Sequence, residues 1–258
     1  TRKRSSAASD VYKRQNEDGA AYLLQVAAPS ADKNIDGVRQ LLQPFNVSAD
    51  SGFAASSLRL DYDVSPAGDA DRFTYLSPIF SGFQLGLSFS PDSDDAASFA
   101  GVGEESDAVD ETYEVAVRYE GMFQNVGVIA GAGYTMGDNS SAAAGTDDRE
   151  IWNVGLDLDI GPFGIGAAYV EDNNAVTTGD TDIYVIGADY TTGPFKLGAS
   201  YYNSDTDNGT EFDRYTGGVT YEYGPGMSFR GSIQYLEEDT AAADADGTAV
   251  LLGTQVKF

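Results

Sequence analysis

The sequence predicts an all-β fold, an antiparallel up-and-down transmembrane β-barrel, on three observations. Apolar and polar residues alternate along many segments, which sends the two sets of side chains to opposite faces of a strand. The connections between these segments are short and long in turn. The long connections hold most of the acidic residues. Membrane barrels have short turns at one end and long loops at the other, with an apolar face toward lipid and a polar face toward a lumen.

Composition restricts the function. The chain has 258 residues and a net charge of −26, with no cysteine and no histidine. No run approaches the ~18 apolar residues of a membrane helix, so any membrane span must be a strand. Without histidine or cysteine there is no Ser-His-Asp triad, thiol nucleophile or thiolate metal site. We therefore predict that the chain is not an enzyme, and its acidity argues against nucleic acid as a partner.

Residues 1–15 differ from the rest of the chain. They hold five of the fifteen basic residues and show neither strand alternation nor the apolar core of a signal peptide. We interpret them as a non-native leader with no role in packing.

Residues 16–69 form a second unit, a long and partly polar segment. Four apolar residues fall at helical spacing before Pro44, which predicts a short helix: Ile35, Val38, Leu41 and Leu42. A segment of this length without strands inside a compact domain is usually functional or disordered.

Residues 70–258 carry the strand pattern. In the hairpin that turns at Ser81-Gly82, the apolar residues Phe83, Leu85, Leu87 and Phe89 alternate with polar or small ones. A related Gly-x-Phe-x-(Leu/Ile)-Gly pattern, with a serine-started or proline variant, recurs at 81–86, 161–166 and 193–198. Eleven strands are expected near 71–80, 82–91, 111–121, 124–136, 149–160, 163–172, 181–191, 194–204, 212–223, 227–237 and 248–258.

Charge separates along the predicted strands. Five long loops hold 25 of the 41 acidic residues and a single base, Arg149, so most negative charge lies at one end of the sheet. We interpret these as long acidic extracellular loops. By alternation, six bases fall on the lumen face: Arg72, Arg118, Lys196, Arg214, Arg230 and Lys257. Each is either a pore charge or half of an ion pair within the wall.

Three stretches resemble the general diffusion porins of Gram-negative bacteria. Residues 75–92, Tyr-Leu-Ser-Pro-Ile-Phe-Ser-Gly-Phe-Gln-Leu-Gly-Leu-Ser-Phe-Ser-Pro-Asp, are similar to the hairpin that follows the constriction loop in these porins. Residues 16–43 resemble that loop, which folds into the barrel. Residues 250–258, Val-Leu-Leu-Gly-Thr-Gln-Val-Lys-Phe, resemble the closing strand, which the outer-membrane assembly machinery recognises.

The resemblance implies a sixteen-stranded barrel, of which about eleven strands are present, so the sheet should be an open, curved meander. It implies a pore constriction that carries Glu17, Asp18, Asp32 and Asp36, and an assembly signal made of Val250, Leu252, Val256 and Phe258. It also implies a homotrimer in the cell outer membrane, in contact with lipid and lipopolysaccharide. No cofactor is expected beyond loosely bound divalent cations.

The leading interpretation is a passive, weakly cation-preferring channel for small hydrophilic solutes and ions. One alternative is a substrate-selective outer-membrane channel. Another is a soluble or surface calcium-binding β-protein, because residues 205–209, Asp-Thr-Asp-Asn-Gly, offer the oxygen ligands that calcium prefers.

Overall fold

The structure is a computed structural model. One antiparallel sheet of twelve strands makes up most of it. Each strand pairs with the strands before and after it in sequence, which confirms the predicted all-β, up-and-down fold. The strands are β1 (Val11–Asn16), β2 (Asp71–Leu76), β3 (Phe83–Ser90), β4 (Val109–Phe123), β5 (Val126–Asn139), β6 (Arg149–Ile160), β7 (Phe163–Asp172), β8 (Thr181–Thr192), β9 (Phe195–Thr206), β10 (Thr210–Gly224), β11 (Met227–Asp239) and β12 (Asp244–Val256). The structure describes residues 11–16, 18–31, 61–68, 70–91, 109–139, 143–241 and 243–257.

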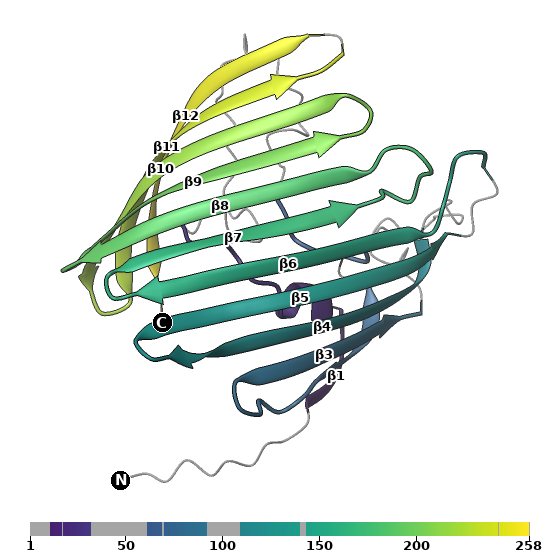
Figure 1. Cartoon of the computed structure of the whole chain (residues 1–258), viewed down its shortest axis with the longest axis horizontal. Coiled ribbons are helices and arrows are strands. Elements are labelled where there is room, and N and C mark those ends of the chain that lie inside the picture. The colour runs from purple at the N-terminus through teal and green to yellow at the C-terminus, as the bar shows by residue number, and fades with distance from the viewer. Residues whose placement is uncertain are drawn as a thin grey trace.

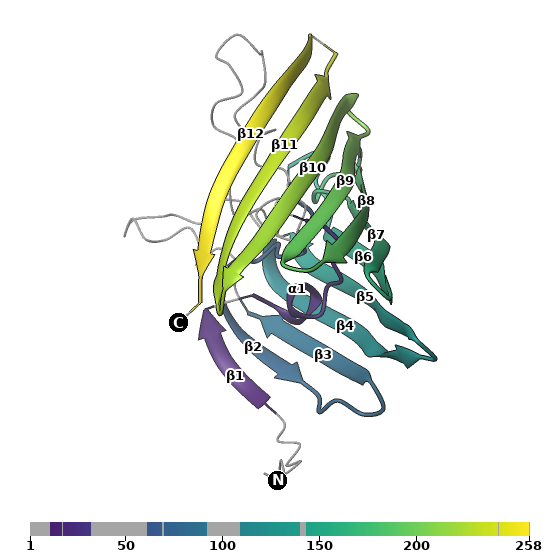
Figure 2. The same cartoon turned by 90° about the vertical axis from the view of Figure 1, so that its left-hand side faces the viewer.

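The sheet is open and curved. β1 and β12 are its two edges, and no pairing between described strands joins them. Figures 1 and 2 show the strands curving around one side, with the short helix α1 (Ala20–Leu23) on the concave side. This is the open meander predicted from the sequence. No helix within the described ranges is long and apolar enough to cross a membrane.

The prediction that residues 1–15 have no place in the sheet is wrong for residues 11–15. β1 pairs with β2 from Val11 opposite Leu76 to Asn16 opposite Asp71, so the described strands number twelve rather than eleven. Edge pairing uses backbone N–H and C=O groups that almost any residue supplies, so a polar edge strand need not show alternation. Residues 1–10 lie outside the described part of the chain.

Two of the predicted long acidic loops are short turns. β9 ends at Thr206 and β10 begins at Thr210, while β11 ends at Asp239 and β12 begins at Asp244. The strands therefore continue through most of the acidic residues. Acidic residues are depleted from most strands, so the sequence indicates loops in these stretches, although the backbone ladder continues through them.

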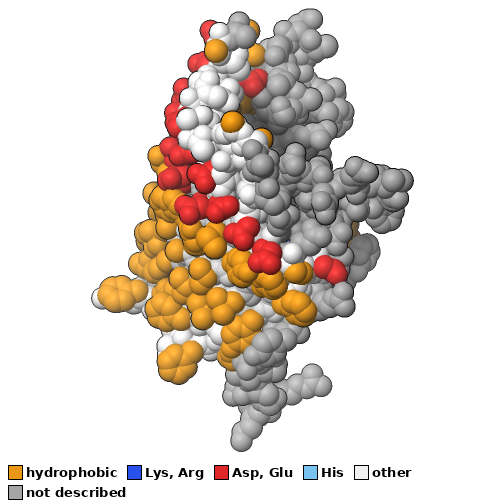
Figure 3. All heavy atoms as spheres, turned by 90° about the vertical axis from the view of Figure 1, so that its right-hand side faces the viewer, with side chains coloured by type: hydrophobic (Ala, Val, Ile, Leu, Met, Phe, Trp, Pro, Cys, Tyr) orange, Lys and Arg blue, Asp and Glu red, His pale blue; other side chains and the backbone are white. Residues whose placement is uncertain are grey.

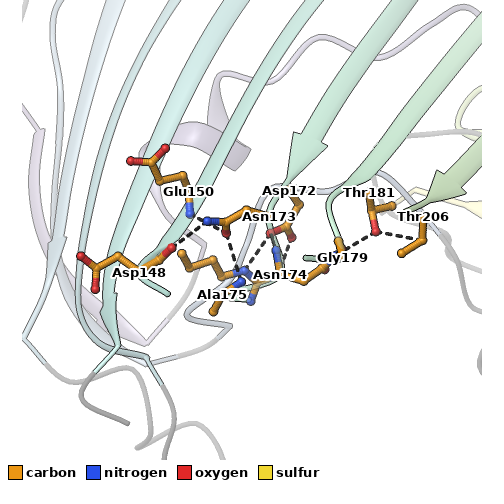
Figure 4. Close-up of polar contacts among 10 residues, drawn as sticks. Asp148, Glu150, Asp172, Asn173, Asn174, Ala175, Gly179, Thr181 and Thr206 are labelled. Atoms are coloured by element: carbon orange, nitrogen blue, oxygen red, sulfur yellow. Dashed lines mark hydrogen bonds and ion pairs between the residues drawn. The ribbon is translucent and has the colours of Figure 1, made fainter. Parts of the chain in front are cut away.

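Side-chain amides join the remaining loops at this end of the sheet (Figure 4). Asn173 donates to the carbonyl of Asp148 at 2.7 Å and accepts from the amide of Glu150 at 2.9 Å. Asn174, at a φ of 52°, donates to the carbonyl of Gly179 at 2.6 Å. Asparagine tolerates the left-handed region better than most residues. The β7–β8 connection is thus fastened to the start of β6.

The convex face of the sheet is apolar. Figure 3 shows hydrophobic side chains gathered in one continuous area, bordered by a row of acidic side chains. The exposed large apolar residues of this face include Leu85, Leu87, Val115, Val117, Leu156, Ile165, Ile186, Leu197, Ile233, Val250 and Leu252. An exposed apolar area of this extent needs an apolar neighbour.

Aromatic pairs lie at both ends of the apolar band. Near the short turns, Phe163 packs on Tyr190 with ring centroids 4.9 Å apart. Near the loops, Tyr201 packs on Tyr215 at 5.0 Å. Two aromatic levels flanking an apolar band are the girdles expected at the two surfaces of a membrane.

Candidate pore constriction

Residues 18–31 cross the concave face of the sheet from one side to the other. The order of their contacts follows the order of the strands. Ala20 lies against β3, Val26 against β5 and β6, Pro29 against β7 and β8, and Ala31 against β9. We call residues 18–31 the inserted segment.

Six glycines form the part of the wall on which the inserted segment lies. A β-carbon placed on any of them would lie less than 3.0 Å from an atom of the segment, a separation that real β-carbons essentially never show. Gly187 is the tightest, at 1.9 Å from the carbonyl oxygen of Pro29. Glycine inside a strand often marks the close approach of another backbone. This glycine track consists of Gly86, Gly131, Gly155, Gly166, Gly187 and Gly198.

The glycine track explains the repeated sequence pattern. Each of the three repeats ends in a glycine of the track: Gly86, Gly166 and Gly198. The repeats therefore mark where strands on the wall receive the inserted segment, in addition to where hairpins turn.

Hydrogen bonds hold the start of the inserted segment. The amide of Ala20 donates to Oγ of Ser88 at 2.8 Å, and the amide of Ala21 donates to Oε2 of Glu114 at 2.8 Å. The other carboxylate oxygen of Glu114 pairs with Arg72 at 3.1 Å, and both side chains are almost fully buried. Glu114 thus connects the wall and the segment.

A second stretch, residues 61–68, returns along the concave side and contacts the inserted segment. The side chain of Gln25 donates to the carbonyl of Tyr62 at 2.6 Å and accepts from the amide of Val64 at 3.0 Å. Arg118 on β4 donates to the carbonyl of Gln25 at 3.1 Å. The segment is therefore bonded on both sides.

Part of the concave face is apolar, which corrects the prediction of a polar inner face on every strand. Tyr62 and Val64 belong to one buried cluster with inward-facing wall residues, among them Ile151, Val170, Val185, Tyr202, Phe212, Leu236 and Leu251. In β7 and β8 the neighbours Tyr169-Val170 and Tyr184-Val185 are apolar on both faces, so alternation does not reveal which side is buried.

Of the four acids predicted at the constriction, the structure describes only Asp18. It is half-buried and accepts a hydrogen bond from Oγ of Ser65 at 3.3 Å. Glu17, Asp32 and Asp36 lie outside the described residues.

The six predicted bases all lie on concave-facing positions but have different surroundings. Arg72 is buried in its pair with Glu114, and the guanidinium carbon of buried Arg214 lies 4.5 Å from the ring centroid of Tyr202. These two are parts of the wall rather than open pore charges. Arg118 lies beside the inserted segment, whereas Lys196, Arg230 and Lys257 line one cavity.

Several residues of this site escaped the prediction from sequence. In the sequence, Ser88, Glu114 and Gln25 are ordinary inward-facing or loop polar residues. Ser88 is 68 residues from its partner Ala20, and Glu114 is 93 residues from its partner Ala21, and pairing over such separations leaves no local pattern. The glycines of the track were visible as a motif, but their partner was not.

Comparison with known proteins identifies the family. Residues 16–241 match the family model of the Gram-negative porins. The chain belongs to the Gram-negative porin family. No curated protein sequence matches it.

Solved porin structures share the fold. A porin refined at 1.8 Å resolution is 21% identical with a TM-score of 0.55, covering 78% of this chain and 64% of that chain. The anion-selective porin from Comamonas acidovorans is 16% identical with a TM-score of 0.56, covering 73% and 59%. The outer membrane protein OmpT of Vibrio cholerae, in its trimer form, is 16% identical with a TM-score of 0.51, covering 74% and 66%. The chain thus spans less than two thirds of the first two porins.

Membership of this family places the protein in the outer membrane. It sets aside the alternative of a soluble β-protein. Within the described residues, no group of three or more acidic side chains is arranged to hold a metal ion.

Proposed function

We propose that this porin is a passive, weakly cation-preferring channel for small hydrophilic solutes and ions. The observation that carries the proposal is the inserted segment, which lies on the concave face at mid-strand and takes up part of the space on that side of the wall. A segment bonded to the wall at both its start and its end keeps a fixed cross-section. Passage then depends on solute size and charge rather than on a moving gate.

Two sets of acids support the cation preference. The chain carries 41 acidic against 15 basic residues, and many acids lie at the loop end of the sheet. They raise the local cation concentration, but screening at physiological salt limits the reach of exposed charges to ~8 Å. We expect Glu17, Asp18, Asp32 and Asp36 to belong to the constriction, where less water surrounds a charge, so each should count more than a loop acid.

The test is the reversal potential of the channel in a planar lipid bilayer under a salt gradient. Asp32→Asn with Asp36→Asn should shift it toward anions more than Asp94→Asn with Asp95→Asn, a matched pair from the loop after β3. Equal shifts from both pairs would mean that residues 16–45 are not the constriction.

We further propose that the loop end binds lipopolysaccharide through divalent cations. Six acids on six neighbouring strands follow one another in cross-strand register on the convex face: Glu171, Asp182, Asp205, Glu211, Asp239 and Asp244. Like charges directly opposite one another destabilise a sheet. Divalent cations shared with lipid phosphates would offset that repulsion. We call these six residues the acidic row.

Assembly completes the proposal. The exposed side chains of Val250, Leu252 and Val256 lie on the convex face of β12, as expected of an assembly signal that faces lipid. We propose that the assembly machinery reads this strand together with Phe258, which lies outside the described residues. The homotrimer of the porin family is the expected final state.

A further inference from the structure

A cavity at the short-turn end of the concave face contains three bases. Its volume is about 410 Å³, and its lining includes Lys196 on β9, Arg230 on β11 and Lys257, the residue after β12. Small-molecule sites span roughly 300–1,000 Å³, so the cavity is large enough for a small solute. The chain has 15 bases in all, and three of them meet here.

Neutral hydrogen-bonding groups and one acid complete the lining. Thr220, Ser228 and Gln255 contribute hydroxyl and amide groups, and Glu222 is exposed at the margin. Gln255 accepts a hydrogen bond from the guanidinium of Arg230. This bond orients the planar fork of the arginine, which suits the spaced oxygens of an oxyanion.

The charges do not cancel within the cavity. Asp189 pairs with Lys196 at 2.7 Å and offsets that ammonium. Lys257 is exposed and has no ion pair within the described residues. Against Glu222, the lining still carries an excess of positive charge in a chain of net charge −26.

The inserted segment forms one margin of this cavity. Ala31, at the end of the described segment, belongs to the lining, and its carbonyl accepts a hydrogen bond from the hydroxyl of Thr220. A solute that leaves the segment on the short-turn side therefore meets the cavity. The cavity is on the concave face, opposite the exposed apolar band, so a dissolved anion fits it better than a lipid headgroup.

From this arrangement we infer that the cavity is an oxyanion-binding site, which takes inorganic phosphate or the phosphate group of a small dissolved solute. It depends on the wall near the short turns and not on the constriction acids. Its test does not require the protein to conduct, so failure of the channel proposal and failure of this one are separate results.

The experiment measures inorganic phosphate binding to the full chain folded in detergent, by ³¹P line broadening. Lys257→Gln should weaken phosphate binding by roughly three- to tenfold, since it removes one exposed charge from the site. Arg149→Gln is the matched control. Arg149 lies at the start of β6, at the loop end of the sheet and away from the cavity, and pairs there with Asp172 at 2.6 Å. The control should leave phosphate binding unchanged.

Arg230→Gln removes another base of the cavity and should also weaken phosphate binding. Circular dichroism of all three variants shows whether the sheet forms. Acetate, with one carboxylate charge, should compete less well than sulfate. Absence of phosphate broadening in the wild-type chain would overturn the inference. So would equal weakening by Lys257→Gln and Arg149→Gln.

Discussion

Gly187 and Pro29 approach so closely that no other residue fits at position 187. An ideal β-carbon there would lie 1.9 Å from the carbonyl oxygen of Pro29. The residues are 158 positions apart in sequence, yet they fix how near the inserted segment comes to β8. The contact is between backbones, so the strand and the segment must move apart if a side chain is added.

Gly187→Ala should therefore displace the inserted segment and destabilise the fold by about 1–3 kcal/mol, the usual effect of overpacking. Gly217→Ala on β10 is the matched control, because a β-carbon there meets nothing within 4 Å. It should be neutral or stabilise by up to ~1 kcal/mol, since alanine is a better strand residue than glycine. Urea unfolding in detergent measures both. Equal losses of stability in Gly187→Ala and Gly217→Ala would mean that the glycine track has no special role in the fold.

Arg72→Gln should cost about 3–5 kcal/mol, because it leaves the carboxylate of Glu114 buried without its cation. Both side chains of this pair are at most 1% exposed. Glu120→Gln breaks the pair of Arg118 and Glu120, whose side chains are 25% and 68% exposed, and should cost about 0–1 kcal/mol. The same unfolding assay compares them, and similar costs would show that Arg72 is not part of the wall.

Deletion of Phe258 should lower the amount of protein inserted in the outer membrane and leave single-channel conductance unchanged. The exposed convex side chains of β12 are suited to recognition before insertion, and they lie away from the concave face. Quantifying the protein in outer-membrane fractions, then recording from the purified channel, separates the two effects. Normal insertion would contradict the assembly role.

Removal of divalent cations with a chelator should lower the melting temperature in lipopolysaccharide-containing bilayers by about 2–4 °C for each kcal/mol of lost binding. Asp205→Asn with Glu211→Gln should reduce this shift, because it breaks the middle of the acidic row. Asp157→Asn with Asp159→Asn, on the concave-facing side of β6, is the control and should leave the shift intact. An unchanged shift in the first variant would remove the acidic row from the lipid contact.

Much of the sheet could be predicted from the sequence, because the alternation of residues such as Phe83 and Leu85 reports which face of a strand is apolar and exposed. β1 could not, since an edge strand pairs through its backbone. The helix of the constriction-like segment was expected near Ile35, which lies outside the described residues, and the helix that the structure describes begins at Ala20. Contacts such as that of Glu114 with Ala21 join distant positions and leave no trace in a local pattern.

The most direct test of the account asks whether the concave face beside the inserted segment is the water path. The chain has no cysteine, so one introduced thiol is the only site for a charged, water-soluble thiol reagent. Arg118 faces the inserted segment, and its neighbour Val117 lies on the convex face with 40% of its surface exposed. During single-channel recording, the reagent should lower the current of Arg118→Cys in one step and leave that of Val117→Cys unchanged. Block of Val117→Cys, or no effect on Arg118→Cys, would contradict the account.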